Sequence, residues 1–100
     1  MKVAEEQTQN KSIIFSEEKL VDNCRAYFST ETEKIAAIGE SFLKYFYKNS
    51  SSQAVLFKTI KEITADINIS HQTLSKVLKI LESKEVIYRR NGIIGLRKEV

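Results

Sequence analysis

The sequence has few of the residues on which most catalytic and extracellular designs depend. Its 100 residues contain no proline, one cysteine, one histidine and three glycines. One cysteine cannot form an intramolecular disulfide, so nothing indicates an oxidising compartment. A metal site or a Ser/His/Asp triad would need the single histidine, His71, and three glycines leave no glycine-rich phosphate loop. We therefore expect no enzymatic activity, no metal and no other cofactor.

Long apolar runs are also missing. No segment approaches the roughly 18 residues that are needed to span a membrane. Residues 1–11 lack the apolar core of a signal peptide. We expect a cytoplasmic protein that has no membrane partner.

Positive charge is concentrated in the last third of the chain. Residues 1–58 hold eight basic and eight acidic side chains, whereas residues 71–98 hold seven basic and two acidic ones, a net charge of +5. A basic patch confined to one segment is typical of phosphate contact. The alternative is an ordinary solvated face.

The hydrophobic periodicity predicts one domain, residues 13–100, preceded by a flexible arm over residues 1–12. The expected helices cover about 16–29, 31–48, 60–67 and 71–84. A strand is expected over about 54–58 and a hairpin over about 86–98. This organisation is mainly helical with a small β-hairpin, an α+β class.

Helix-start signals support the two N-terminal helices. Ser16 is a suitable N-cap, and Thr30 and Glu33 have the spacing of a capping box. Cys24 falls on the apolar face of the first helix with Phe28. Burial of Cys24 in the core is the main interpretation, and redox sensing is the alternative.

Aromatic residues are crowded into the N-terminal half, since eight of the nine precede residue 58. Tyr45, Phe46 and Tyr47 are consecutive, so at least one of them points away from a helical core. Exposed rings indicate a self-association surface. We expect a homodimer with Phe28, Tyr45 and Tyr47 as candidate contacts; alternatively, the rings fill the core of a compact monomer.

Residues 59–84 have the pattern of two helices joined by a sharp turn. Thr59 and Glu62 form a capping box at the start of the first helix. Asn68 stands where this helix must end, and asparagine tolerates the left-handed backbone that a sharp turn needs. Ser70 is a suitable N-cap for the second helix. The apolar residues of that helix recur at i, i+3, i+4 and i+7 and are Leu74, Val77, Leu78 and Leu81.

The period changes from helical to strand-like after Glu85. Asn91-Gly92 is a strong hairpin signal, because a type I′ turn needs positive φ at both central residues. A two-residue loop fixes the register, with the expected pairs Arg90–Ile93, Arg89–Ile94, Tyr88–Gly95 and Ile87–Leu96. The residues expected to face the core are Ile87 and Leu96, and those expected on the other side are Tyr88, Arg90 and Ile93.

The pattern I-x3-I-N-I-S-x2-T-L-S-x2-L-x2-L-E-S-K-E-V-I-x-R, together with its flanks over residues 54–98, resembles winged helix-turn-helix DNA-binding proteins. It is similar to the small winged-helix proteins of Gram-positive plasmids and, more loosely, to the multiple-antibiotic-resistance type regulators. Thr64 and Asn68 depart from the usual Ala and Gly, and the hairpin is shorter than in those regulators. The resemblance implies a winged helix-turn-helix with two additional N-terminal helices. It makes the helix after Ser70 the recognition helix and the hairpin the wing. It also implies that the strand over about 54–58 pairs with the wing.

The resemblance implies DNA contacts from both elements. The recognition-helix candidates are His71, Gln72, Thr73, Ser75, Lys76 and Lys79. The wing candidates are Tyr88, Arg89, Arg90, Asn91, Arg97 and Lys98. Three of the four arginines lie on the wing, and arginine suits guanine and narrow minor grooves. The wing is therefore one candidate for the readout; in the alternative the helix reads bases, for example adenine through Gln72, while the wing holds the backbone. Tyr88 either bonds a phosphate or packs on the wing.

We expect a sequence-specific double-stranded DNA-binding protein without catalytic activity. The main hypothesis is an accessory factor that marks an origin of replication or conjugative transfer on a plasmid or mobile element, with a relaxase or replication enzyme as partner. One alternative is a small dimeric transcriptional repressor that binds an operator. Another is a winged-helix module for protein interaction, against which the basic patch argues. The first two require only site-specific binding, so the sequence does not separate them.

Overall fold

The computed structural model describes residues 16–97; the expected arm, residues 13–15 and Lys98 lie outside this range. The elements are α2 (Glu17–Arg25), a 3-10 turn η2 (Ala26–Phe28), α3 (Glu33–Asn49), β1 (Val55–Leu56), α4 (Ile60–Ile67), α5 (His71–Ser83), β2 (Ile87–Arg90) and β3 (Ile93–Leu96). The chain is thus mainly helical with a small three-stranded antiparallel sheet, as the α+β prediction requires. Within residues 16–97, no helix has the length and apolar character to cross a membrane.

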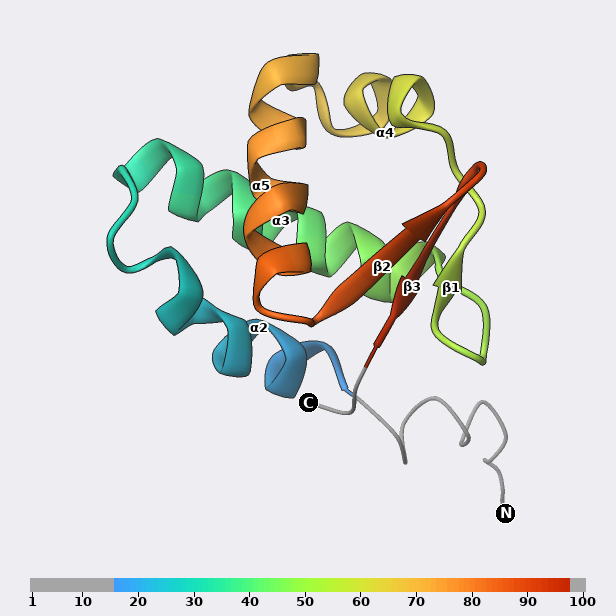
Figure 1. The fold of residues 1–100 in the computed structure, drawn as a ribbon, viewed down its shortest axis with the longest axis horizontal. Helices are drawn as coiled ribbons and strands as arrows, with labels where there is room; N and C mark the ends of the chain where they lie inside the picture. The colour runs from blue at the N-terminus through green and yellow to red at the C-terminus, as the bar shows by residue number, and fades with distance from the viewer. Residues whose placement is uncertain (1–15, 98–100) are drawn as a thin grey trace.

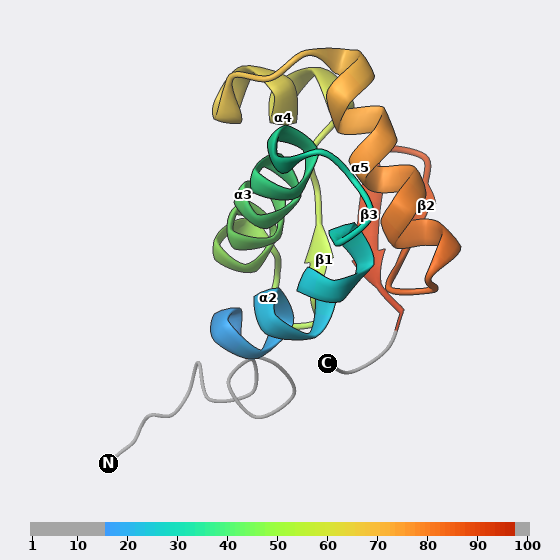
Figure 2. The same cartoon turned by 90° about the vertical axis from the view of Figure 1, so that its left-hand side faces the viewer.

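Helix α3 lies at the centre of the molecule. Figures 1 and 2 show α2 on one side of α3 and α4 on the opposite side, while α5 crosses α3. Helix α3 contacts α2, α4 and α5, and α5 also contacts β2. Helix α3 therefore joins α2 to the later helices α4 and α5.

The core is built from the helical stripes that the sequence contains. All four stripe residues of α5 are fully buried, namely Leu74, Val77, Leu78 and Leu81. The stripe of α2, including Cys24, is buried with them, which confirms the main interpretation of that cysteine. Each fully buried aliphatic side chain stabilises the fold by about 1.5–3 kcal/mol relative to exposure. These stripes therefore decide which face of each helix is left to solvent.

Side-chain caps fix three of the four α-helix starts as predicted. Ser16 accepts a hydrogen bond from the Lys19 N–H at 3.2 Å. Thr59 and Glu62 form a reciprocal capping box. Ser70 accepts from the Thr73 N–H at 3.1 Å. Each such cap satisfies a backbone donor that the helix itself leaves unpaired.

The predicted start of α3 is wrong by two residues. Thr32, not Thr30, is the N-cap, and it accepts a hydrogen bond from the Ile35 N–H at 3.2 Å. The reason is the preceding turn, in which the Glu31 N–H donates to the Phe28 carbonyl at 3.0 Å. Because this bond holds the Glu31 backbone in the turn, Glu31 is not part of the helix, which begins at Glu33.

Two non-glycine residues in left-handed conformation end α4 and α5. Asn68 has φ 56° as predicted, and its N–H donates to the Thr64 carbonyl. Glu85 has φ 61°, which the sequence does not suggest. Around Glu85, the Val86 N–H donates to the Leu81 carbonyl at 2.9 Å and the Glu85 N–H to the Glu82 carbonyl at 3.0 Å. This is the Schellman pattern, which favours glycine at the position of Glu85.

The hairpin has the predicted register in all four pairs. Its turn is not the expected type I′, because Gly92 has φ 73° but Asn91 does not have the positive φ that this turn type also needs. Strand β1 pairs with β3, as expected, and the sheet order is β1-β3-β2. Strand β1 is shorter than the predicted 54–58, because Ala54 has φ 62° and the chain leaves the sheet after Leu56. Ile87 is 2% exposed and Leu96 is half-buried, so both face the core side as expected.

Replacing Glu85 with glycine is expected to stabilise the protein. Glycine adopts positive φ without the steric cost of a Cβ, so the free energy of unfolding should rise by about 0.5–1 kcal/mol. Urea unfolding followed by circular dichroism measures this. Glu85→Ala is the matched control, since it removes the same charge and keeps the Cβ; equal effects of both substitutions would contradict the backbone explanation.

Candidate nucleic-acid interface

The exposed face of α5 brings together most of the predicted recognition residues. A shallow surface hollow of about 560 Å³ is lined by His71, Gln72, Ser75, Lys76, Lys79, Ile80 and Ser83. We call these seven residues the α5 face. Five of the six predicted recognition residues belong to it. Ile80 and Ser83 extend the face by one turn; the i, i+4 spacing from Lys76 and Lys79 could have identified them.

Thr73 does not belong to the α5 face. Its side chain is half-buried, and its hydroxyl accepts a hydrogen bond from Ser70 Oγ at 2.8 Å. The Thr73 N–H in turn donates to Ser70 Oγ. Thr73 thus closes the N-cap of α5, and the structure assigns it to holding the helix start.

Two cations of the α5 face differ in their surroundings. Lys76 Nζ lies 3.4 Å from Glu31 Oε1, so part of its charge is balanced. Lys79 is exposed and forms no ion pair with residues 16–97. Glu31 comes from the turn before α3, far away in sequence, and no local signal marks it as a neighbour of α5. An acidic side chain thus borders the α5 face.

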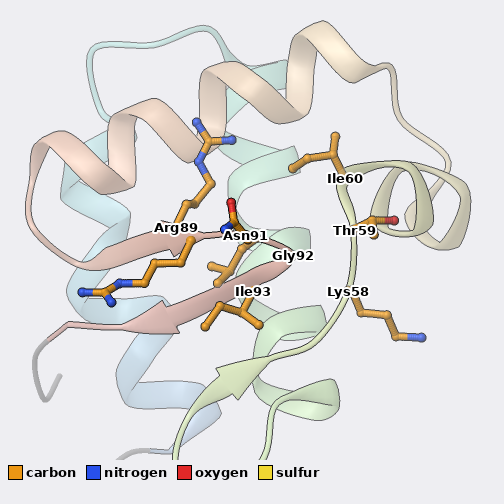
Figure 3. A pocket seen from close by; sticks show the side chains of 9 residues that line it. Lys58, Thr59, Ile60, Arg89, Asn91, Gly92 and Ile93 are labelled. Carbon is orange, nitrogen blue, oxygen red and sulfur yellow. The ribbon is translucent and has the colours of Figure 1, made fainter.

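Arg89 points to the core side of the hairpin. It lies on the same strand face as Ile87, and its Nη2 is 3.1 Å from Glu82 Oε1 on α5. Figure 3 shows Arg89 directed toward α5. This ion pair is one-third exposed on both sides, so it contributes at most about 1 kcal/mol. The structure therefore separates Arg89 from the other wing candidates and makes it a link between hairpin and helix.

The remaining described wing candidates lie on the outer face or at the tip of the hairpin. Tyr88 packs over Gly95, the Arg90 guanidinium carbon lies 5.9 Å from the centre of the Tyr88 ring, and Arg97 is exposed. Asn91 occupies the tip. Lys98 lies outside the described residues. Of the two interpretations of Tyr88, packing on the hairpin is observed.

A second hollow, of about 420 Å³, separates the hairpin tip from the start of α4. It is lined by Lys58, Thr59, Ile60, Arg89, Arg90, Asn91, Gly92, Ile93 and Ile94. In Figure 3 the segment that carries Lys58 and Ile60 runs beside the hairpin tip. The structure thus adds Lys58 to the basic residues near the hairpin, which sequence spacing alone did not suggest.

The structure gives the exposure of the aromatic rings that were candidate dimer contacts. Phe28 is 3% exposed and packs on Gly39, where an added Cβ would lie 2.7 Å from the ring. The prediction that Phe28 is a surface contact is therefore wrong, because the close approach of η2 and α3 buries its ring. Tyr47 is half-buried. The large exposed ring among residues 16–97 is Phe57, which is 66% exposed.

Tyr45, the third dimer candidate, joins α3 to α4. Its hydroxyl donates a hydrogen bond of 2.5 Å to Asp66 Oδ2, and Lys58 Nζ lies 3.9 Å from the same oxygen. Burial, together with this bond, raises the pKa of Tyr45 above its usual value. The tyrosine is therefore a neutral donor at physiological pH, engaged within the chain.

Comparisons with protein-family models, curated proteins and solved structures find no match to this chain. Over residues 16–97 no group of three or more His, Cys, Asp or Glu side chains is placed to hold a metal ion. The interpretation of the site rests on its own geometry: a polar helix face, a basic hairpin and the acidic residues that border them.

Replacing Tyr45 with phenylalanine tests whether this side chain stabilises the monomer. Loss of this exposed hydrogen bond should lower the free energy of unfolding by about 0.5–1.5 kcal/mol, measured by urea unfolding at pH 7. Tyr27→Phe is the control, because the Tyr27 hydroxyl makes no hydrogen bond within residues 16–97 while its ring stays beside Lys84. An unchanged unfolding energy combined with weaker self-association in sedimentation would instead make Tyr45 a dimer contact.

Proposed function

We propose that this chain is a non-catalytic, sequence-specific double-stranded DNA-binding protein of the winged helix-turn-helix type. Support comes from the order of elements, in which α4 and α5 meet at a sharp turn and are followed by a hairpin. The strand β1 before α4 pairs with that hairpin. This is the arrangement that the resemblance over residues 54–98 implies.

The observation that carries the proposal is the α5 face. Its opposite side is fully buried, so the helix has one polar surface, which carries an amide, an imidazole, two hydroxyls and two ammonium groups. An α-helix fits the major groove of B-DNA, where base edges present donors and acceptors. In our proposal Gln72 and Ser75 face base edges, and Lys79 contacts a phosphate.

The hairpin supplies the second contact in this proposal. Arg90 and Arg97 form no ion pair with residues 16–97, whereas Arg89 is paired to Glu82. Arg90 and Arg97 therefore hold the DNA backbone or a groove edge, and Arg89 keeps the hairpin against α5. This division replaces the expectation that all three arginines contact DNA.

The biological role is proposed from the resemblance. We infer an accessory factor that marks a replication or transfer origin on a plasmid or mobile element for a relaxase or replication enzyme; an operator-binding repressor is the alternative. Capture of fragmented DNA from the source organism, plasmids included, separates them. A retained site beside an origin supports the first, and a site overlapping a promoter supports the second.

In either role a homodimer remains a prediction, and Phe57 is the exposed ring to substitute first.

Replacing Arg90 with glutamine should weaken duplex binding and its dependence on salt. Losing one phosphate contact should reduce affinity about tenfold and lower the magnitude of the slope of log K against log salt by about 1. Fluorescence anisotropy with a duplex from the capture experiment, at several salt concentrations, measures both. The control is the charge-balanced pair Glu82→Gln with Arg89→Gln, which should leave the slope unchanged. If the control lowers the magnitude of the slope more than Arg90→Gln does, Arg89 also contacts DNA.

Replacing Glu31 with glutamine should strengthen duplex binding. The substitution frees Lys76 and removes a carboxylate that borders the α5 face. The expected gain is about 2- to 5-fold at low salt, and it should fade as salt rises. Glu18→Gln on α2 is the control, since it removes the same charge at an exposed position on another helix. An equal gain from both variants would show a general charge effect and place the DNA elsewhere.

A further inference from the structure

A tyrosine ring covers the middle of the outer hairpin face. Tyr88 on β2 is opposite Gly95 on β3, and a Cβ built at Gly95 would overlap the Tyr88 ring. The ring therefore lies directly over the backbone of β3, in space that only a glycine leaves open. The side chain is half-buried, so part of the ring remains accessible.

Arginines lie near this ring on the same face. The Arg90 guanidinium carbon lies over the ring, 5.9 Å from its centre. An open hollow of about 780 Å³ is lined by Tyr88, Arg89, Arg90, Ile93, Leu96 and Arg97. Arg90 and Arg97 are exposed and form no ion pair with residues 16–97. The face thus combines a partly accessible aromatic ring with two exposed arginines, one of which lies over the ring.

We propose that the outer hairpin face binds single-stranded DNA, with one unpaired base stacked on Tyr88 and the adjoining phosphates held by Arg90 and Arg97. Stacking on an aromatic side chain requires an accessible base plane, which a duplex conceals within its own stack. An aromatic ring in a positively charged groove is the combination by which single strands are bound without sequence preference. This site does not include the α5 face. It shares Arg90 and Arg97 with the proposed duplex contact, and Tyr88 is the residue that distinguishes the two.

If Tyr88 only covers Gly95, its side chain needs properties different from those that base stacking requires. Covering Gly95 needs apolar bulk, which leucine supplies as well as tyrosine. Stacking a base needs a flat π surface, which phenylalanine supplies and leucine does not. Comparing these two substitutions at one position therefore separates the two roles.

The experiment measures binding of a fluorescein-labelled oligothymidylate, which cannot form a duplex with itself, by anisotropy. Tyr88→Phe should keep the affinity within about 3-fold, whereas Tyr88→Leu should lose about 5- to 150-fold, the range for one stacked base. Tyr27→Leu removes another tyrosine ring that has a cation beside it, Lys84, and should change nothing. Thermal unfolding of each variant verifies that it is folded. Equal affinities of the leucine and phenylalanine variants would overturn the proposal.

Photocross-linking tests the contact in the unmodified protein. An oligothymidylate carrying one 5-iododeoxyuridine is irradiated with the wild-type chain, and the modified peptide is identified by mass spectrometry. Cross-linking at Tyr88 is expected; cross-linking confined to the α5 face would overturn the proposal.

A blunt duplex, measured in parallel, separates this proposal from the proposed function. Tyr88-dependent binding of the oligothymidylate without duplex binding would leave this site standing and reject the duplex proposal. Duplex binding together with binding of the oligothymidylate that does not depend on Tyr88 would support the duplex proposal and reject the single-strand site.

Discussion

Burial of one stripe of α5 is the constraint on which the rest of the structure depends. Leu74, Val77, Leu78 and Leu81 are inaccessible to solvent, and together they contribute about 6–12 kcal/mol relative to exposure. Since net domain stability is about 5–15 kcal/mol, no rotation of α5 about its axis is tolerated. The same stripe that stabilises the core therefore presents the opposite polar face to solvent, with fixed side-chain spacing.

The hairpin is tied to that helix by backbone and side-chain interactions. The Schellman turn at Glu85 directs the chain from α5 into β2, and the Asn91-Gly92 turn returns it as β3. The Arg89–Glu82 ion pair adds a small side-chain link. Because successive side chains of a strand point to opposite faces, Arg89 lies on the core side with Ile87, and Tyr88 and Arg90 lie on the outer face. The proposed duplex contact therefore uses the α5 face together with the outer hairpin face, whereas the proposed single-strand contact uses the outer hairpin face alone.

Local signals in the sequence predicted the elements well, and contacts between distant segments account for what they missed. Caps, helical periodicity and the Asn-Gly turn act within a few residues, so the helices and the hairpin register could be deduced. The start of α3 moved because the preceding turn takes Glu31. The burial of Phe28, the Lys76–Glu31 pair and the inward direction of Arg89 depend on tertiary packing. Sequence spacing therefore located most of the α5 face but not the charges that border it.

The most direct test of the central proposal is an NMR titration of the isotope-labelled chain with a duplex selected from a random-sequence pool. If the α5 face and the hairpin bind the duplex, the amide shifts are concentrated at His71, Gln72, Ser75 and Lys79 and on the hairpin, and α2 is unaffected. Absence of a selected duplex, or shifts centred on α2 and the adjoining face of α3, would contradict it.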